Sequence, residues 1–297
     1  MTAPGGLGPR DQGALAGLPG YGGRNGRRGG RSNDGALRST LVALVSTVVV
    51  FGLLVWITVN APGWAEVQAS FFNATVFSNA FPDIVAAFLL NVQLFAIAEV
   101  LILVLALVLA VLRSLPGPVF FPLRFLATIY ADIFRAVPGV LVIYILGFGI
   151  PGLGLPGIPT DPFPYAVIAL TLIYSAYVSE VYRAGIESVH PSQEAAARSL
   201  GLTRLQALRY VILPQAVRRV IPPLLNDFIG LQKDTVLVSY IGVVEIFRQS
   251  QITQQAKFNY TPYMATALVF IAITIPLARL TDILVARDRR RAAASAR

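Results

Sequence analysis

The stretch IVAAFLLNVQLFAIAEVLILVLALVLAVL, residues 84–112, contains a single charged side chain, Glu99. A helix needs about 20 predominantly apolar residues to cross the hydrocarbon core of a bilayer. This stretch is longer than that, so we expect a transmembrane helix that tilts or that extends beyond the hydrocarbon. The chain is therefore expected to be a membrane protein.

The composition of the whole chain agrees with a membrane location. Of the 297 residues, 55% are hydrophobic and 13% are charged, whereas an ordinary soluble domain has about 25% charged residues. The chain contains no cysteine and one histidine, His190. This excludes disulfides and thiolate metal sites, and it argues against a zinc cluster or a histidine-based catalytic triad. We expect no catalytic residues, no metal site and no cofactor.

Five further apolar segments have the length of a membrane span. They cover residues 38–59, 132–150, 163–184, 218–244 and 263–285. Arg135 and Pro138 interrupt the second of these segments. Lys233 and Asp234 interrupt the fourth. The sequence predicts an all-α membrane protein with about six transmembrane helices, and it leaves five or seven open.

The N-terminal segment differs in composition from the rest of the chain. Residues 1–37 are rich in glycine and arginine and have almost no apolar runs. Such a segment buries too little apolar surface to offset the entropy lost on ordering, so we expect it to be disordered. A secretory signal is the alternative, but the leading region is too long and no clear small-x-small cleavage site follows. Residues 38–60 are therefore expected to remain as an N-terminal transmembrane helix.

The positions of arginine and lysine orient the predicted spans. The connecting segments 60–83 and 151–162 carry no basic residue. Arginines lie instead in the segments that alternate with them, which are 1–37, 113–131, 185–217 and the basic tail 287–297. Because short basic loops remain in the cytoplasm, both termini are expected there, beside anionic lipid. The segment 245–262, with Arg248 and Lys257, is the exception. The net charge of +9 is thus a topology signal, and no nucleic-acid partner is expected.

A polar helical segment, residues 190–216, lies between two apolar runs. Ser192 is a candidate N-cap for a first short helix. Glu194 lies in the first turn, where it can pair with Arg198 four residues later. Gly201 suits the left-handed position that ends such a helix.

A second helix is expected directly after the first. Thr203 and Gln206 have the spacing of a capping box, and Pro214 is expected to interrupt the helix. Two other interpretations of the segment remain open. The segment can be a helical hairpin that simply packs at the membrane surface. Alternatively, the order of small residues, glycine and second helix in AARSLGLTRLQALR is typical of a DNA-reading helix-turn-helix. The adjacent spans leave no room for a three-helix DNA-binding domain.

The same segment resembles the EAA loop of ABC importer permeases of the polar amino-acid uptake branch. That loop has the pattern Gln-x-Glu-Ala-Ala-Arg-x-Leu-Gly, followed after about ten residues by Leu-Pro-Gln-Ala. The matching residues here are Gln193, Ala196, Ala197, Arg198, Leu200, Gly201, Leu213, Pro214, Gln215 and Ala216. One position departs from the pattern, because Ala195 stands where the family has glutamate and Glu194 lies one residue earlier. One residue turns a side chain by about 100° around a helix.

Further motifs extend the resemblance over residues 84–286. Asp132–Pro138 is similar to the family's Phe-Arg-x-x-Pro signature, and Ala176–Gly185 is similar to Ala-Tyr-x-x-Glu-x-x-Arg-x-Gly. The family pattern downstream of the EAA loop is matched by Pro222–Asn226, Leu231–Thr235 and Ile241–Glu245. The Asp132–Pro138 motif and the long N-terminus look most like glutamate-type permeases of high-GC Gram-positive bacteria.

The resemblance implies the core of a type I ABC importer permease with an extra N-terminal helix, located in the bacterial cytoplasmic membrane. It implies that the EAA loop forms a coupling helix that docks on a separate ATPase. The residues carried over to this contact are Gln193, Glu194, Ala195, Ala196, Ala197, Arg198, Gly201 and Leu202. No phosphate-binding loop exists in the chain, so it is expected to be a transport subunit and not an enzyme.

The resemblance also implies partners and a cargo. The partners are an ATPase dimer, a second permease that is identical or paralogous, and an extracytoplasmic amino-acid-binding protein. The cargo is a polar amino acid, with glutamate or a related amino acid favoured. The alternative function is a self-contained secondary transporter or channel, which would need no ATPase.

Polar side chains within the predicted spans are candidates for a substrate pathway. Charges at membrane depth are expensive and are usually paired or functional. The candidates are Asn91, Glu99, Glu180, Lys233 and Asp234. A zwitterionic amino acid needs both signs of charge around it, and Lys233 and Asp234 supply them. Ion pairs or hydrogen bonds between helices, which would only fix the packing, are the competing interpretation. Glu180 and Arg183 have the spacing of such a pair.

Overall fold

The computed structural model describes residues 33–295, which form helices and no strand. The N-terminal helix α1 covers Asn33–Val59. It therefore begins five residues before the predicted boundary, because residues 36–38 are Ala, Leu and Arg, all good helix formers. The rest of the segment predicted to be disordered, residues 1–32, lies outside the described residues.

Helix α1 has the length and apolarity of a membrane span. Its span Arg38–Val59 has a mean hydropathy of 2.6, and none of it is buried inside the chain. The chain divides into two compact units, Met1–Trp64 and Ala65–Arg297. We therefore describe the second unit by itself as the helical bundle.

The first long helix of the bundle confirms the predicted span 84–112. Helix α2 covers Trp64–Phe71, and α3 covers Ala74–Ser114, with 41 residues. Asn73 caps α3, since its side chain accepts a hydrogen bond of 3.0 Å from the backbone N–H of Val76. Helix α3 is thus longer than a bilayer is thick, as the sequence indicated.

The predicted span 132–150 is bent, because it covers the end of one arm and most of the other arm of a bent pair of helices. The short helix η2 covers Pro118–Phe120 and leads into α4, Phe121–Ala136. The second arm consists of α5, Gly139–Tyr144, the π-helical turn η3, Ile145–Gly149, and α6, Ile150–Gly152. The two arms meet at an angle of 104°. Pro138 lies at the break, where it lacks the N–H that would continue the helical hydrogen bonds.

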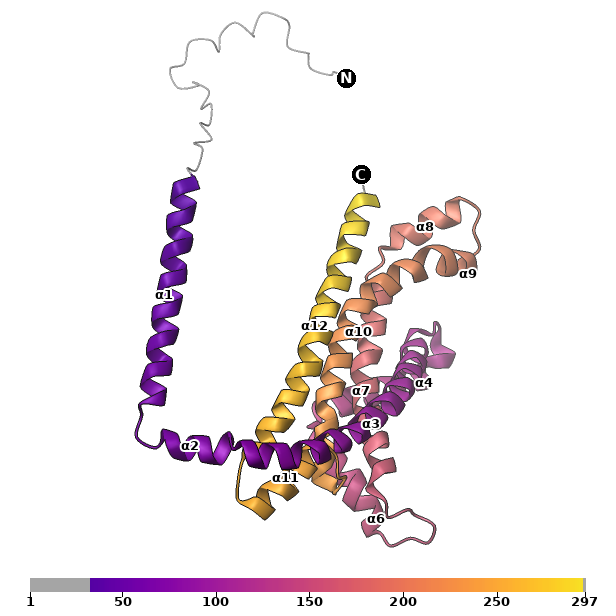
Figure 1. The fold of residues 1–297 in the computed structure, drawn as a ribbon. Coiled ribbons are helices and arrows are strands. Elements are labelled where there is room, and N and C mark those ends of the chain that lie inside the picture. The colour runs from indigo at the N-terminus through magenta and orange to yellow at the C-terminus, as the bar shows by residue number, and fades with distance from the viewer. Residues whose placement is uncertain (1–32, 296–297) are drawn as a thin grey trace, which may run out of the picture. The chain divides into compact units, whose positions relative to one another are not determined.

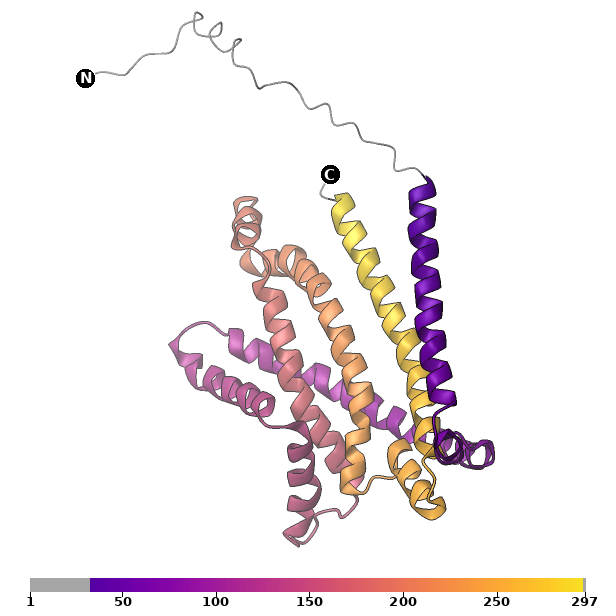
Figure 2. The same ribbon diagram turned by 90° about the vertical axis from the view of Figure 1, so that its left-hand side faces the viewer.

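Helix α7, Pro162–Glu187, lies at the centre of the bundle. It packs against α3, α4 and α10 (Figures 1 and 2). Its contact faces are rich in small residues, such as Ala166, Ala169 and Ala176, each with 0% exposure. On α3, Ala98 and Ala106 are equally buried. Small side chains let helix backbones approach closely, which drives helix association inside a membrane.

The remaining helices follow α7 along the chain. They are α8, Pro191–Ser199; α9, Arg204–Ala207; the π-helical turn η4, Leu208–Ile212; α10, Leu213–Asp234; η5, Thr235–Ile241; α11, Ile246–Lys257; and α12, Thr261–Ser295. The expectation that Pro214 interrupts the second helix is wrong. Helical structure runs without a break from Arg204 to Asp234, because the π turn takes up the missing hydrogen bond.

By length and apolarity, four described helices qualify as membrane spans, or five if the bent pair counts as one. The predicted span 218–244 corresponds to most of α10 with η5. Helix α10 contains Arg218, Arg219 and Lys233 and does not qualify on hydropathy. The predicted class, an all-α membrane protein, is confirmed.

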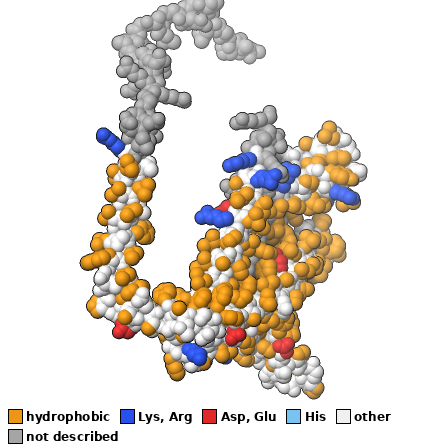
Figure 3. Space-filling view, viewed as in Figure 1, with side chains coloured by type: hydrophobic (Ala, Val, Ile, Leu, Met, Phe, Trp, Pro, Cys, Tyr) orange, Lys and Arg blue, Asp and Glu red, His pale blue; other side chains and the backbone are white. Residues whose placement is uncertain are grey.

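The two ends of the bundle differ in charge. Lys and Arg side chains gather at the end that carries α8, α9 and the C-terminal part of α12, beyond a broad apolar band (Figure 3). The tail predicted at 287–297 continues α12 as helix up to Ser295.

Candidate functional site

The residues from 190 to 216 form a compact element at the α8–α9 end of the bundle. Its first helix is capped by His190, whose Nδ1 accepts a hydrogen bond of 3.2 Å from the backbone N–H of Ser192. The prediction that Ser192 is the cap is therefore wrong by two residues. Pro191 explains the shift, since its fixed φ angle suits the first helical position.

Gly201 ends α8 as predicted. Its φ angle is 87°, in the left-handed region that a side chain disfavours. The N–H of Gly201 donates to the carbonyl of Arg198 at 3.0 Å, and the N–H of Leu202 donates to the carbonyl of Ala197 at 3.3 Å. This pair of bonds is a Schellman motif, which satisfies the free carbonyls at the helix end.

The second helix starts with the predicted capping box. The N–H of Gln206 donates to Oγ1 of Thr203 at 3.3 Å, and the N–H of Thr203 donates to Oε1 of Gln206 at 2.9 Å. The turn between α8 and α9 is thus fixed on both sides. The element is a defined hairpin of two short helices, as the sequence indicated.

The acidic group of the element pairs differently from the prediction. Glu194 lies 3.8 Å from Arg204 of α9, and no ion pair with Arg198 is formed among the described residues. The hairpin fold brings α9 back over α8, so a partner in the next helix replaces the partner one turn away. Glu194 therefore joins α8 to α9.

The exposed face of the element combines small and large apolar side chains. Gln193, Ala195, Ala196 and Arg198 are exposed, whereas Ala197 is buried. Around them the large apolar residues Leu200, Leu205 and Tyr210 are 85%, 73% and 64% exposed. Apolar side chains grouped on a polar element usually mark an interaction surface.

The element connects α7 to α10, and these two helices contact each other beside it. Arg219 of α10 donates a hydrogen bond to the carbonyl of Ser188, just after α7. Gln215 donates to Gln193 of α8 at 3.4 Å. Gly185 of α7 faces Val220 of α10 so closely that a Cβ at residue 185 would overlap the valine side chain. Displacement of the element should therefore move α7 and α10 together.

Of the predicted pathway residues, Asn91 serves packing. Its side chain is buried, and its Nδ2 donates to Oγ1 of Thr235 and to a carboxylate oxygen of Glu245, both at 3.0 Å. Its Oδ1 accepts from the N–H of Ile246 at 3.1 Å. Glu245 in turn caps α11 by accepting from two backbone N–H groups. The amide of Asn91 is thus fully used inside the protein, which favours the packing interpretation.

Glu180 also joins helices. Its carboxylate lies 2.6 Å from Arg113 of α3, 3.3 Å from Arg135 of α4 and 2.8 Å from Arg183 of α7. The predicted pair with Arg183 is confirmed, and two further arginines join it. Three helices are therefore held together by one carboxylate.

Asp234 lines a cavity of about 320 Å³ between α5, α7 and α10. Its carboxylate accepts a hydrogen bond of 2.7 Å from the hydroxyl of Tyr174. Asp227 lines the same cavity, and its buried Oδ2 has no hydrogen-bond partner in the described part of the chain. The cavity is also lined by Gly139, Val140, Ile173, Tyr177, Asn226, Gly230 and Leu237. It holds two carboxylates and no basic side chain, so it is suited to a cationic group.

The other two candidates lie outside this cavity. Lys233 is exposed and does not line it, because neighbours along a helix point about 100° apart. The structure therefore does not bring Lys233 and Asp234 together as a pair of opposite charges. Glu99 of α3 is half-buried and is not among the residues that line this cavity.

Asp227 was not among the pathway residues predicted from the sequence, although its spacing from Asp234 indicates it. It precedes Asp234 by seven residues, which is two helical turns, so both carboxylates lie on one face of α10. Gly230 lies between them on the same face and leaves space for the cavity.

Comparison with known proteins adds independent findings. Residues 114–290 match the family model described as binding-protein-dependent transport system inner membrane component. The chain is 37% identical over 175 residues to the probable glutamine ABC transporter permease protein GlnM of Bacillus subtilis, which covers 59% of this chain and 78% of the relative. It is 34% identical over 215 residues to the glutamate transport system permease protein GluC of Corynebacterium efficiens, covering 69% and 93%.

A solved structure is similar as well. The crystal structure of an amino acid ABC transporter with histidines contains a chain that superposes with a TM-score of 0.66 and 30% sequence identity. The superposition covers 72% of this chain and 98% of that one.

Proposed function

The chain belongs to the family of binding-protein-dependent transport system inner membrane components, as an ABC importer permease for amino acids, and we propose that it imports a polar amino acid with energy from ATP hydrolysed by a partner. It is a multi-pass membrane protein and a transport subunit, not an enzyme. Membership implies an ATPase and a binding protein as partners.

The observation that carries the proposed coupling is the construction of the 190–216 element. It presents a small-residue face rimmed by exposed Leu200 and Leu205, it connects α7 to α10 along the chain, and Arg219 of α10 bonds to Ser188 just before it. Closure of an ATPase dimer pulls such an element inward and shifts the equilibrium between two arrangements of the helices. The ATPase contact is assigned to Gln193, Glu194, Ala195, Ala196, Ala197, Arg198, Gly201 and Leu202.

The proposed orientation follows from charge and from this contact. The α8–α9 end, where basic side chains gather, faces the cytoplasm, and so do both termini. The opposite end, which carries α11, faces the extracytoplasmic binding protein. A second permease, identical or paralogous, completes the pathway.

For the substrate, we propose that Asp227 and Asp234 bind the ammonium group that every amino acid carries. Buried carboxylates are costly unless a cation or donors satisfy them, and Oδ2 of Asp227 has no partner in the described chain. The sequence motifs favoured glutamate or a related amino acid. The negative charge of this cavity favours the uncharged and basic members of that group over glutamate itself.

Site-directed crosslinking tests the coupling, because the chain has no native cysteine. Ala196→Cys is paired with single cysteines in the ATPase groove, and Gln255→Cys on α11 is the matched control at the other end of the bundle. We expect disulfides with the ATPase from residue 196 and none from residue 255. Crosslinks from residue 196 only to its own chain would disprove the contact.

Reconstitution separates this function from its alternative. A self-contained secondary transporter or channel moves its substrate when the purified chain is alone in a vesicle. We expect uptake only when the ATPase, the binding protein and ATP are all present. Uptake by the chain alone would support the alternative.

A further inference from the structure

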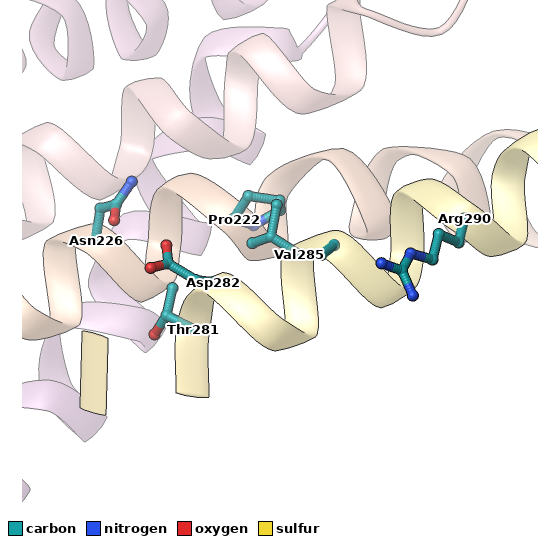
Figure 4. Close-up of a pocket in the computed structure, with 7 residues that line it drawn as sticks. Pro222, Asn226, Thr281, Asp282, Val285 and Arg290 are labelled. Atoms are coloured by element: carbon teal, nitrogen blue, oxygen red, sulfur yellow. The ribbon is translucent and has the colours of Figure 1, made fainter. Parts of the chain in front are cut away.

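A polar groove between α10 and α12 shares one lining residue, Asn226, with the cavity that holds Asp227 and Asp234. It has a volume of about 530 Å³ and lies at the α8–α9 end of these helices. It is lined by Pro222 and Asn226 from α10 and by Thr281, Asp282, Val285, Ala286 and Arg290 from α12. Figure 4 shows Asp282 and Arg290 on opposite sides of the apolar pair Pro222 and Val285.

The prolines of α10 leave two backbone carbonyls of this helix without their usual donors. Pro222 and Pro223 lie inside the helix and have no N–H to donate. The carbonyls of Arg218 and Arg219, four residues earlier, therefore lose their usual helical donors. A ligand with N–H groups can satisfy acceptors of this kind.

The polar side chains of the groove are available to a ligand. Asp282 has one ion pair among the described side chains, with Arg279 at 3.9 Å, and both groups are more than 70% exposed. Neither Arg290 nor the amide of Asn226 has a partner among the described side chains. An exposed pair at that distance is weak, so the carboxylate can exchange it for a better donor.

The spacing of the two charges selects the kind of ligand. The Cα atoms of Asp282 and Arg290 lie about 12 Å apart along α12, since each residue of a helix rises about 1.5 Å. An α-amino acid carries its ammonium and carboxylate on one carbon atom, which is short for this distance. A phosphoethanolamine headgroup separates ammonium from phosphate by two carbon atoms and fits better.

The surroundings of the groove indicate where such a headgroup would come from. Leu280, Ile283 and Leu284 on the same part of α12 are 53%, 63% and 40% exposed. Beyond them the helix continues with Arg287 and Arg290. The groove thus lies where the apolar surface of the bundle gives way to the basic end, which is the level of lipid headgroups.

We propose that this groove binds the headgroup of an aminophospholipid. The ammonium donates hydrogen bonds to Asp282 and to the amide oxygen of Asn226, and the phosphate accepts from Arg290. The acyl chains lie along the exposed leucine and isoleucine side chains of α12. The bound lipid fills the space between α10 and α12 and stabilises their packing.

Lipid binding to the purified full-length chain tests this directly. Dioleoyl phosphatidylethanolamine is compared with dioleoyl phosphatidylcholine, whose methylated ammonium cannot donate hydrogen bonds, by native mass spectrometry and by the shift in Tm. We expect phosphatidylethanolamine to bind about tenfold more tightly, as one charge-assisted hydrogen bond allows. Asp282→Asn and Arg290→Gln should each weaken the binding of phosphatidylethanolamine by about tenfold. Arg279→Gln, one turn away and outside the groove, is the control: it removes only the weak ion pair of Asp282 and should cause no loss of lipid binding.

Three results would overturn the assignment. They are equal binding of the two lipids to the unmodified chain, an equal loss in Arg279→Gln, and a Tm increase with free glutamine that matches the increase with phosphatidylethanolamine. The last result would assign the groove to a soluble amino acid instead. If a variant fails to fold, the comparison of the two lipids on the unmodified chain still tests the lipid assignment. Neither measurement uses transport, so the outcome is independent of the proposed ATP coupling.

Discussion

Gly201 shows how one residue can control an element. Its φ angle of 87° costs a residue with a Cβ about 1–2 kcal/mol. Its N–H and that of Leu202 close the Schellman motif. Nothing lies within 4 Å of the position that a Cβ would take. The requirement for glycine is therefore conformational and not a matter of space.

Gly201→Val is expected to keep the protein in the membrane at normal abundance and to abolish uptake, because the turn between α8 and α9 cannot keep its shape. The matched control is Gly157→Val, at a φ of 84° with equally free surroundings in the segment between α6 and α7. Uptake by reconstituted vesicles measures both. Normal uptake by the Gly201 variant would refute a coupling role for this turn.

Asp227 is the residue on which the substrate proposal depends most. Asp227→Asn keeps the size of the side chain and removes its charge. We expect the KM for the amino acid to rise by about tenfold to a hundredfold, because the variant loses a hydrogen bond to a charged group. Uptake is measured with saturating ATP and binding protein. Lys233→Met on the same helix, outside the cavity, should leave KM unchanged. An unchanged KM in the Asp227 variant would exclude this cavity from the pathway.

At the scale of elements, the contact between α7 and α10 passes movement from the 190–216 element into the membrane. Gly185 and Val220 form its tightest point. Gly185→Leu overpacks this contact, which typically costs about 1–3 kcal/mol, and it should separate the two helices.

We therefore expect Gly185→Leu to lower Tm and to reduce ATP-dependent uptake. The double variant Gly185→Leu with Val220→Ala returns volume to the contact and should recover part of both. Thermal unfolding in detergent and uptake in vesicles are the two measurements. Failure of the second substitution to restore either would show that the contact does not limit the movement.

A second contact between elements depends on Asn91. It holds Glu245 and the start of α11 against α3. Asn91→Leu leaves a buried carboxylate short of a donor, which costs about 1–3 kcal/mol. We expect a lower Tm for this variant. Gln93→Leu, exposed on the same helix, should unfold like the unmodified chain, and equal Tm values for the two variants would contradict the packing role.

At the scale of the whole molecule, α1 belongs to the N-terminal unit of the chain. Its span is 0% buried in the chain, and the chain divides into units near Trp64. A chain that lacks residues 1–60 should therefore fold and transport at a normal rate for each molecule in the membrane. Uptake normalised to membrane abundance tests this. If uptake falls, an unrelated transmembrane helix is fused in place of residues 1–60. Recovery of uptake would assign α1 a role in membrane insertion only. No recovery would assign α1 a role in transport.

The sequence alone determined the features that depend on neighbours along the chain. Apolar runs predicted the membrane location and most helices, because span length follows from bilayer thickness. The end of α8 at Gly201 and the capping box at Thr203 were predictable for the same reason, since a helix end is satisfied by residues within one turn of it.

The tertiary structure decided every feature that joins distant segments. Glu180 meets Arg113 and Arg135 across three helices, Asn91 meets Glu245 across 154 positions, and Asp227 shares a cavity with residues of α5 and α7. Helical periodicity shows which residues share a face of one helix, but it contains no information about which helix lies opposite. That choice is set by how small and large side chains fit together in the bundle, and it decides whether a polar residue is used for packing or is left free for a ligand.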